Sequence, residues 1–305
     1  MNFAYKPAWN LLKQVANSWL DDYAPSMGAA LAFYTLFSLA PLLLIVIAVA
    51  GLVFGEDAAR GEIAAQLSAL MGGPGARAVQ ELLASVRQPQ DGQAATALGT
   101  LLLLIGATTV LGELQDSLDR IWRVPERIRS SGWWTLIRSR LLSLGMILAI
   151  GFLLMVSLLA SAALAAVGRW WDPLLAGYYT LAVMVNATLG FLLMAVVFAL
   201  IYKVMPRVHV LWRDVWVGAI FTASLFTLGK AVIGWYVGRS GTVTAFGAAG
   251  SLVVILLWVY YSAQIFLIGA EFTWVYANLF GSRKPADPAP RGDPPRPANA
   301  PSSRS

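Results

Sequence analysis

The stretch that decides the fold runs from Thr244 to Ala277 and reads TAFGAAGSLVVILLWVYYSAQIFLIGAEFTWVYA. It carries no charged residue before Glu271. The hydrocarbon core of a bilayer is about 30 Å thick, and roughly 20 apolar residues cross it as a helix. We therefore predict a transmembrane helix over residues 245–275, with length to spare.

Three polar side chains of this helix fall close to one face. Tyr261, Gln264 and Glu271 stand at positions i, i+3 and i+10, with Ile268 between them. An amide or a carboxylate that faced lipid would find no hydrogen-bond partner there. We expect this face to be turned toward protein, with the other helices packed around it.

The composition predicts an all-α polytopic membrane protein. Of the 305 residues, 58% are hydrophobic and 12% are charged, whereas roughly 25% are charged in an average soluble domain. The net charge of +6 comes from basic residues that lie between apolar segments. Such residues orient a protein in the bilayer and attract anionic lipid headgroups, so we expect the bilayer as a partner and no nucleic acid.

Hydropathy predicts six transmembrane helices, and Pro41 predicts a kink in the first, because proline removes a backbone donor. Residues 1–25 form an amphipathic helix that either lies in the membrane interface or folds onto the bundle. Residues 281–305 hold seven prolines and are expected to be a disordered tail. The predicted spans are 27–54, 95–111, 141–167, 180–204, 215–237 and 245–275.

Residues 55–93 leave the membrane as a predicted helical hairpin that caps one face of the bundle. Apolar residues mark two short amphipathic helices, and Gly72-Gly73-Pro74-Gly75 is expected to break them apart. The hairpin carries a net charge of −2.

The basic residues predict the orientation. Sixteen Lys and Arg lie in the terminal segments and the second and fourth loops, against five in the other three loops. The positive-inside rule then places both termini in the cytoplasm and the hairpin outside. The sequence specifies no oligomeric state.

Four runs of sequence resemble the YihY/BrkB family of bacterial inner-membrane proteins, once labelled ribonuclease BN. Asp119, in the second run, stands where the family pattern leads us to expect asparagine. The resemblance implies a six-helix protein of the inner membrane with cytoplasmic termini. The matching runs are ALAFYTLFSLAP (30–41), LQDSLDRIW (114–122), YKVMPRVHVLWRDVWVGA (202–219) and LLWVYYSAQIFLIGAEF (256–272).

An enzyme is not expected. The chain has no cysteine and one histidine, and no phosphate-binding glycine loop, nucleophile elbow or HExxH motif. Glu113, Asp116 and Asp119 form an acidic group, but Arg120 and Arg123 are near enough in sequence to act as its salt-bridge partners. We interpret the group as a helix end held by ion pairs and expect no catalytic, cofactor or metal residue, which argues against a ribonuclease.

Polar side chains within the predicted bundle suggest a transporter or exporter of an envelope-related solute or lipid. They serve equally well as interhelical hydrogen bonds, in which case the protein is a membrane scaffold or an envelope-integrity factor. No ATP-binding domain is recognisable, so transport is expected to proceed without an ATPase of its own. The candidate functional residues are Tyr34, Ser38, Glu113, Asp116, Arg120, Asn186, Lys230, Tyr261, Gln264 and Glu271.

Glu271 is expected at the cytoplasmic edge, about 39 Å along the helix from Ala245. Lys230 lies near the opposite edge, where its side chain can extend to the interface. We therefore hypothesise that Glu271 forms a partly buried ion pair with Arg120 or Arg213.

Overall fold

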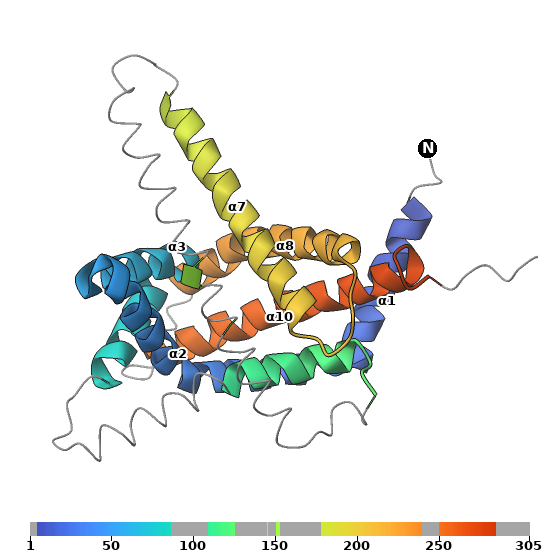
Figure 1. The fold of residues 1–305 in the computed structure, drawn as a ribbon, viewed down its shortest axis with the longest axis horizontal. Helices are drawn as coiled ribbons and strands as arrows, with labels where there is room; N and C mark the ends of the chain where they lie inside the picture. Colours follow the sequence, from blue (N-terminus) through green and yellow to red (C-terminus); the bar gives the residue numbers. More distant parts are fainter. Residues whose placement is uncertain are drawn as a thin grey trace, which may run out of the picture.

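The computed structural model describes residues 5–86, 109–125, 145, 151–152, 178–239 and 250–284, and every regular element in these ranges is a helix (Figure 1). The all-α fold is thus confirmed for this part of the chain. The helices are α1 (Tyr5–Asp21), α2 (Ala24–Phe54), α3 (Glu56–Val86), α7 (Tyr178–Val204), α8 (Trp212–Arg239) and α10 (Gly250–Leu279), with a further helical segment at residues 109–121.

Helix α10 is the centre of the described structure and packs against α1, α2, α3 and α8 (Figure 1). Its buried residues Ile265, Phe266 and Leu267 join the main core with Leu118, Ile121 and residues of α2, α7 and α8. The stretch that was predicted to organise the chain therefore does so. Its first described residue is Gly250, and the predicted start at residue 245 lies outside the described residues.

Helices α8 and α10 run antiparallel and approach closely through a reciprocal pair of glycines and threonines. A methyl group built on Gly218 would lie 1.8 Å from the Thr273 Oγ1 atom, and one built on Gly269 would lie 1.9 Å from the Thr222 Oγ1 atom. Each threonine hydroxyl donates to the glycine carbonyl one turn earlier on its own helix, at 2.7 Å in both cases. Small residues at these positions let the two backbones meet, and the hydroxyls need no further partner.

The contact repeats one short sequence on both helices. Residues 218–222 read Gly-Ala-Ile-Phe-Thr and residues 269–273 read Gly-Ala-Glu-Phe-Thr. The rings of Phe221 and Phe272, which share a position in the motif, stack with their centroids 3.9 Å apart. The two motifs are therefore related by a local twofold arrangement.

Two of the described helices are long and apolar enough to cross a membrane, with the segments Ala187–Val204 and Leu252–Leu279, and α2 is a third if its bent halves form one span. Helix α8 covers the predicted fifth span but is not among the segments found within the described residues. Apart from residues 109–111, 145 and 151–152, the predicted second and third spans lie outside the described residues.

The predicted kink in α2 is confirmed. The segments Ala24–Ala40 and Leu42–Leu52 meet at an angle of 43°. Pro41 lies between them, where its missing N–H interrupts the helical hydrogen bonds.

The predicted break at Gly72-Gly73-Pro74-Gly75 is wrong, because α3 is helical from Glu56 through Val86. Ile63 and Leu83 would be about 30 Å apart in a straight helix, yet both pack on the same cluster around Leu43 and Val79. Helix α3 therefore bends back on itself between them, and the glycines and the proline permit a bend without ending the helix.

Helices α1 and α3 lie at opposite ends of α10 (Figure 1). Leu11 and Val15 of α1 pack against Val275, whereas α3 packs near Ile255. Helix α1 therefore folds onto the bundle, one of the two predicted placements. Its outer face still exposes Trp9, Leu12 and Leu20, the side chains that an interfacial helix presents to a membrane.

The close contact between α8 and α10 predicts opposite effects of one substitution at two glycines. Gly269→Ala should cost about 1–3 kcal/mol of stability, because the methyl group collides with Thr222. Gly190→Ala in α7, where a methyl group meets nothing within 4 Å, should gain about 0.5–1 kcal/mol. Thermal unfolding in detergent measures both, and equal effects would contradict the packing.

Candidate functional site

Four parts of the chain meet around the C-terminal end of α10. The turn between α1 and α2 supplies Tyr23, whose ring lies 5.6 Å from the Arg120 guanidinium. The end of helix 109–121 supplies Trp122, which Arg283 covers at 4.9 Å. The connection between α7 and α8 supplies Arg207. We call this region the polar end of the bundle.

Glu271 is fully buried there, with 0% of its side chain exposed. Neither of its carboxyl oxygens has a hydrogen-bond partner among the described residues. The Asp22 carboxyl lies within hydrogen-bonding reach of it, and the Asp22 Oδ2 atom is likewise buried without a donor. The buried Glu271 carboxyl and the partly exposed Asp22 carboxyl thus lie close together, with three of their oxygens buried and without a donor among the described residues.

Arg123 is the cation that acts most strongly on Glu271, but its guanidinium lies 4.3 Å from the Trp274 ring centroid. Arg123 has φ 53°, in the left-handed region, and ends helix 109–121 in a Schellman motif. The Val124 N–H donates to the Asp119 carbonyl at 2.9 Å and the Arg123 N–H to the Arg120 carbonyl at 3.0 Å. Glycine usually fills this position, and a residue with a side chain costs about 1–2 kcal/mol there.

The hypothesised ion pair between Glu271 and Arg120 or Arg213 is wrong. Arg120 lies over Tyr23, and Arg213 lies 4.0 Å from its neighbour Asp214. Asp22, next to the Tyr23 that Arg120 covers, lies beside Glu271 instead. A partner from the α1–α2 turn could not be read from spacing along one helix.

A second cluster at the polar end surrounds Arg207. The buried carboxylate of Asp119 accepts from the Arg207 backbone N–H at 2.8 Å and from its Nη1 at 3.0 Å. Gln115 accepts from Nη2 at 3.4 Å and donates to the Met205 carbonyl at 2.9 Å. These bonds attach helix 109–121 to the connection between α7 and α8.

The acidic group is held by an ion pair, but not by the predicted arginines. Asp116 lies 3.7 Å from Arg207 Nη1, with 67% of its side chain exposed. Burial raises the pKa of Glu113, and the Asp116 carboxylate raises it further, so both effects disfavour the ionised form that a metal ion would need. Within the described ranges, no group of three His, Cys, Asp or Glu residues is placed to hold a metal.

The other two residues of the predicted polar stripe on α10, Tyr261 and Gln264, also contact protein. The Gln264 amide donates to the Pro25 carbonyl of α2 at 3.4 Å and lies against Gly28, where a methyl group would be 1.9 Å from Nε2. The Tyr261 hydroxyl lies against Gly229 of α8. The stripe thus contacts two different helices and the α1–α2 turn.

The remaining candidate residues do not gather at the polar end. Tyr34 is 37% exposed and packs edge-on against Phe33, whereas Ser38 is buried. Lys230 is exposed on α8. The side chain of Asn186 lies outside the described residues.

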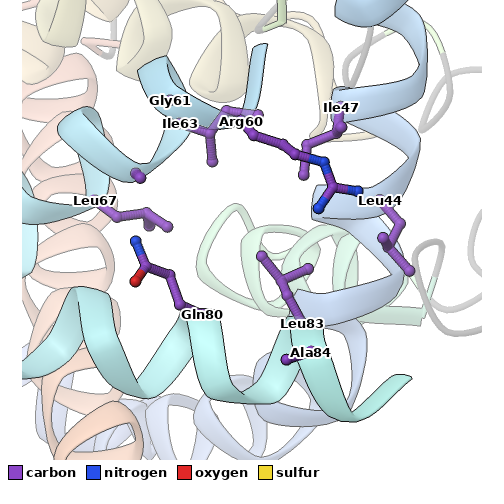
Figure 2. A pocket seen from close by; sticks show the side chains of 10 residues that line it. Leu44, Ile47, Arg60, Gly61, Ile63, Leu67, Gln80, Leu83 and Ala84 are labelled. Carbon is purple, nitrogen blue, oxygen red and sulfur yellow. The ribbon is translucent and has the colours of Figure 1, made fainter. Parts of the chain in front are cut away.

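A cavity of about 420 Å³ lies near the other end of α10, between α2 and the two arms of α3 (Figure 2). Arg60 extends toward Leu44 and Ile47 of α2, and Gln80 reaches in from the second arm of α3 (Figure 2). Arg60 donates through Nε and Nη2 to the Glu56 carboxylate, at 3.1 and 2.6 Å. The rest of the lining is Gly61, Ile63, Ala64, Leu67, Leu83 and Ala84.

Residues 15–293 match the model of a protein family described as virulence factor BrkB. The chain belongs to the BrkB family. It is 30% identical over 263 residues to a UPF0761 membrane protein of Verminephrobacter eiseniae, covering 85% of this chain and 60% of that protein. A UPF0761 membrane protein of Ralstonia nicotianae is 31% identical over 252 residues, covering 82% and 55%. A third, from Neisseria meningitidis serogroup B, is 26% identical over 258 residues, covering 83% and 60%.

The predicted family resemblance is therefore confirmed. The chain spans about 60% or less of the length of these curated relatives. Their names describe membrane proteins, in agreement with the apolar helices of this BrkB-family chain. No solved structure gives a significant match.

Several residues of the BrkB-family polar end were not predicted as site residues, notably Asp22 and Arg207. Asp22 follows an amphipathic helix and Arg207 lies 88 residues from Asp119, so no local pattern connects them to their partners. The hydroxyls of Thr222 and Tyr202 are 3.0 Å apart beside Gly269. The sequence gives one indication of this contact. The repeated Gly-Ala-x-Phe-Thr motif marks the contact to which they belong.

The cluster around Arg207 predicts unequal effects at its two carboxylates in this BrkB-family protein. Asp119→Ala should cost about 3 kcal/mol, because it leaves a partly buried arginine without its partner. Asp116→Ala removes an exposed carboxylate from the same arginine and should cost at most about 1 kcal/mol. Denaturant or thermal unfolding in detergent compares them, and a cost at Asp116 that matched the cost at Asp119 would refute the assignment.

Proposed function

We propose that this protein is a transporter of the bacterial inner membrane that moves a lipid-like amphiphile with an anionic group. The observation that carries the proposal is the cavity between α2 and α3. Its volume of about 420 Å³ falls in the range of about 300–1,000 Å³ typical of small-molecule sites. The protein needs no ATPase of its own if the amphiphile moves down its concentration gradient or if its movement is coupled to that of an ion.

The lining of the cavity fits an amphiphile better than a polar solute. Leu44, Ile47, Leu67 and Leu83 supply apolar walls, and Arg60 supplies the positive charge. Glu56 accepts hydrogen bonds from Nε and Nη2 of the Arg60 guanidinium. The two N–H groups of Nη1 can therefore donate to a second acceptor. Acyl chains would lie against the leucines while an anionic group binds Arg60.

The orientation that we propose places the cavity on the outer side of the membrane. Helix α3 packs near Ile255 and α1 near Val275, which are about 30 Å apart along α10, or roughly the thickness of the hydrocarbon core. The distribution of basic residues then places α1, the polar end and both termini in the cytoplasm.

Single cysteines test this orientation without background, because the chain has none of its own. Cysteine at Ser68, exposed on α3, should react with an impermeant thiol reagent in intact spheroplasts. Cysteine at Asn10, exposed on α1, should react only after permeabilisation. The reverse pattern would invert the orientation, and equal labelling of both would exclude it.

Proteoliposomes with a headgroup-labelled anionic lipid test the transport. The full chain should speed the appearance of label on the opposite leaflet, measured with an impermeant quencher, relative to empty vesicles. Arg60→Gln should slow it about ten-fold, the equivalent of a charge-assisted hydrogen bond of about 1.5 kcal/mol. Ala84→Trp should block it by filling the cavity.

Arg77→Gln is the matched control, because Arg77 is exposed on the same helix and does not line the cavity. It should leave the rate unchanged. A full chain that moves lipid no faster than empty vesicles would refute the transporter and favour the alternative, a membrane scaffold. Equal slowing by Arg60→Gln and Arg77→Gln would refute the cavity as the site.

A further inference from the structure

Glu271 is a buried carboxyl without a hydrogen-bond partner among the described residues, and the proposed transport cavity does not account for it. A buried carboxylate is normally hydrogen-bonded or paired with a cation, yet both Glu271 oxygens are buried with no partner among the described residues. The neighbouring Asp22 carboxyl is within reach. Two ionised carboxylates cannot bond to each other, because neither carries a hydrogen to donate.

The charged groups around Glu271 are predominantly acidic. Asp21 and Asp22 act on it from the α1–α2 turn, and Arg123 acts on it from the end of helix 109–121. Arg123 makes no ion pair with it and instead covers the Trp274 ring. Among the described residues, Arg123 is the one cation that acts on Glu271, and it offsets only part of the negative charge.

Within the part of the chain that the structure describes, no charged group of the other elements acts on Glu271. Helix α8 contributes Gly218 and Thr222 and the Phe221 ring, and the Thr222 hydroxyl already donates to its own helix. Helix α1 contributes the apolar Leu11 and Val15. Pro25 and Gly28 of helix α2 contact Gln264, which lies two turns before Glu271 on α10.

We propose that Asp22 and Glu271 hold one proton between them and form a proton-binding site at the polar end of the bundle. A shared proton turns one carboxyl into a donor and the other into its acceptor, which gives the buried Glu271 carboxyl and the buried Asp22 Oδ2 atom a partner at once. It also removes one of the two charges that would otherwise repel each other in a medium of low dielectric.

The proton would join the α1–α2 turn to α10. When it leaves, the two carboxylates repel each other, and Arg123 is the cation that can replace it by leaving Trp274. In a transporter such a step couples the position of α1 and α2 to proton binding. That coupling rests on the proposed function, whereas the proton-binding site does not.

The pH dependence of unfolding tests the site on the full chain in detergent, without any transport assay. If the folded protein holds one proton that the unfolded chain releases above the usual carboxyl range, stability must fall as pH rises. The unfolding equilibrium constant should increase by up to about ten-fold per pH unit as pH rises above the usual carboxyl range of about 4.

Glu271→Gln should remove this dependence, because the amide donates permanently in place of the proton. Asp22→Asn should also flatten it and keeps the test decisive if the first variant fails to fold. Glu81→Gln, at an exposed carboxylate of α3, should keep the wild-type slope. The infrared band of a protonated carboxyl at neutral pH should be present in the wild type and absent from Glu271→Gln.

The proton-binding site would be refuted if unfolding of Glu271→Gln kept the pH dependence of the wild type. It would also be refuted if the wild type lacked the infrared band of a protonated carboxyl. Neither result would bear on lipid movement by the wild type. Conversely, if the protein binds the proton but moves no lipid, the proton-binding site stands and the proposed transport function is refuted.

Discussion

The structure depends on the close approach of α8 and α10 at Gly218 and Gly269. Each glycine receives the threonine of the other helix, with no space for even a methyl group. Because each threonine hydroxyl donates to its own helix, the contact leaves no polar group unsatisfied. Within a membrane, where the hydrophobic effect gives no reason for two helices to associate, such packing is what holds them together.

This contact also determines the surroundings of Glu271, which stands between Gly269 and Thr273. The helix that carries the carboxyl is held against α8 on one side and receives the α1–α2 turn near the same level. Water is excluded as a result, and Glu271 is fully buried. A looser contact would admit water, and an unpaired carboxylate would then be tolerated.

Sequence reasoning was most successful where one element decides the outcome. The apolar run of α10 and the proline in α2 each act within their own helix, and both predictions agree with the structure. The bend in α3 shows the limit, because Gly72-Gly73-Pro74-Gly75 indicates a change of direction but does not say whether the helical hydrogen bonds stop there.

Partners from distant elements were the least predictable. Asp119 pairs with Arg207 instead of Arg120, and Glu271 meets Asp22 instead of Arg120 or Arg213. Arg207 comes from the α7–α8 connection, and Asp22 precedes a turn in which Tyr23 has the unusual φ of 57°. Spacing along a helix carries no information about such turns.

The repeated motif offers an internal comparison for the buried carboxyl. The third position is Ile220 in α8, where it is 49% exposed, and Glu271 in α10, where it is fully buried. The helix contact itself does not require an acid, since the α8 copy makes the same glycine and threonine contacts without one.

A buried carboxyl at this position costs stability that an apolar side chain would not, and Arg123, the cation that could offset it, is held over Trp274 by a strained turn. Strain of this kind persists where the surrounding structure imposes it and is most frequent at sites that switch or bind. An unneutralised acid beside a displaced arginine is the arrangement that a mobile charge such as a proton can occupy and leave.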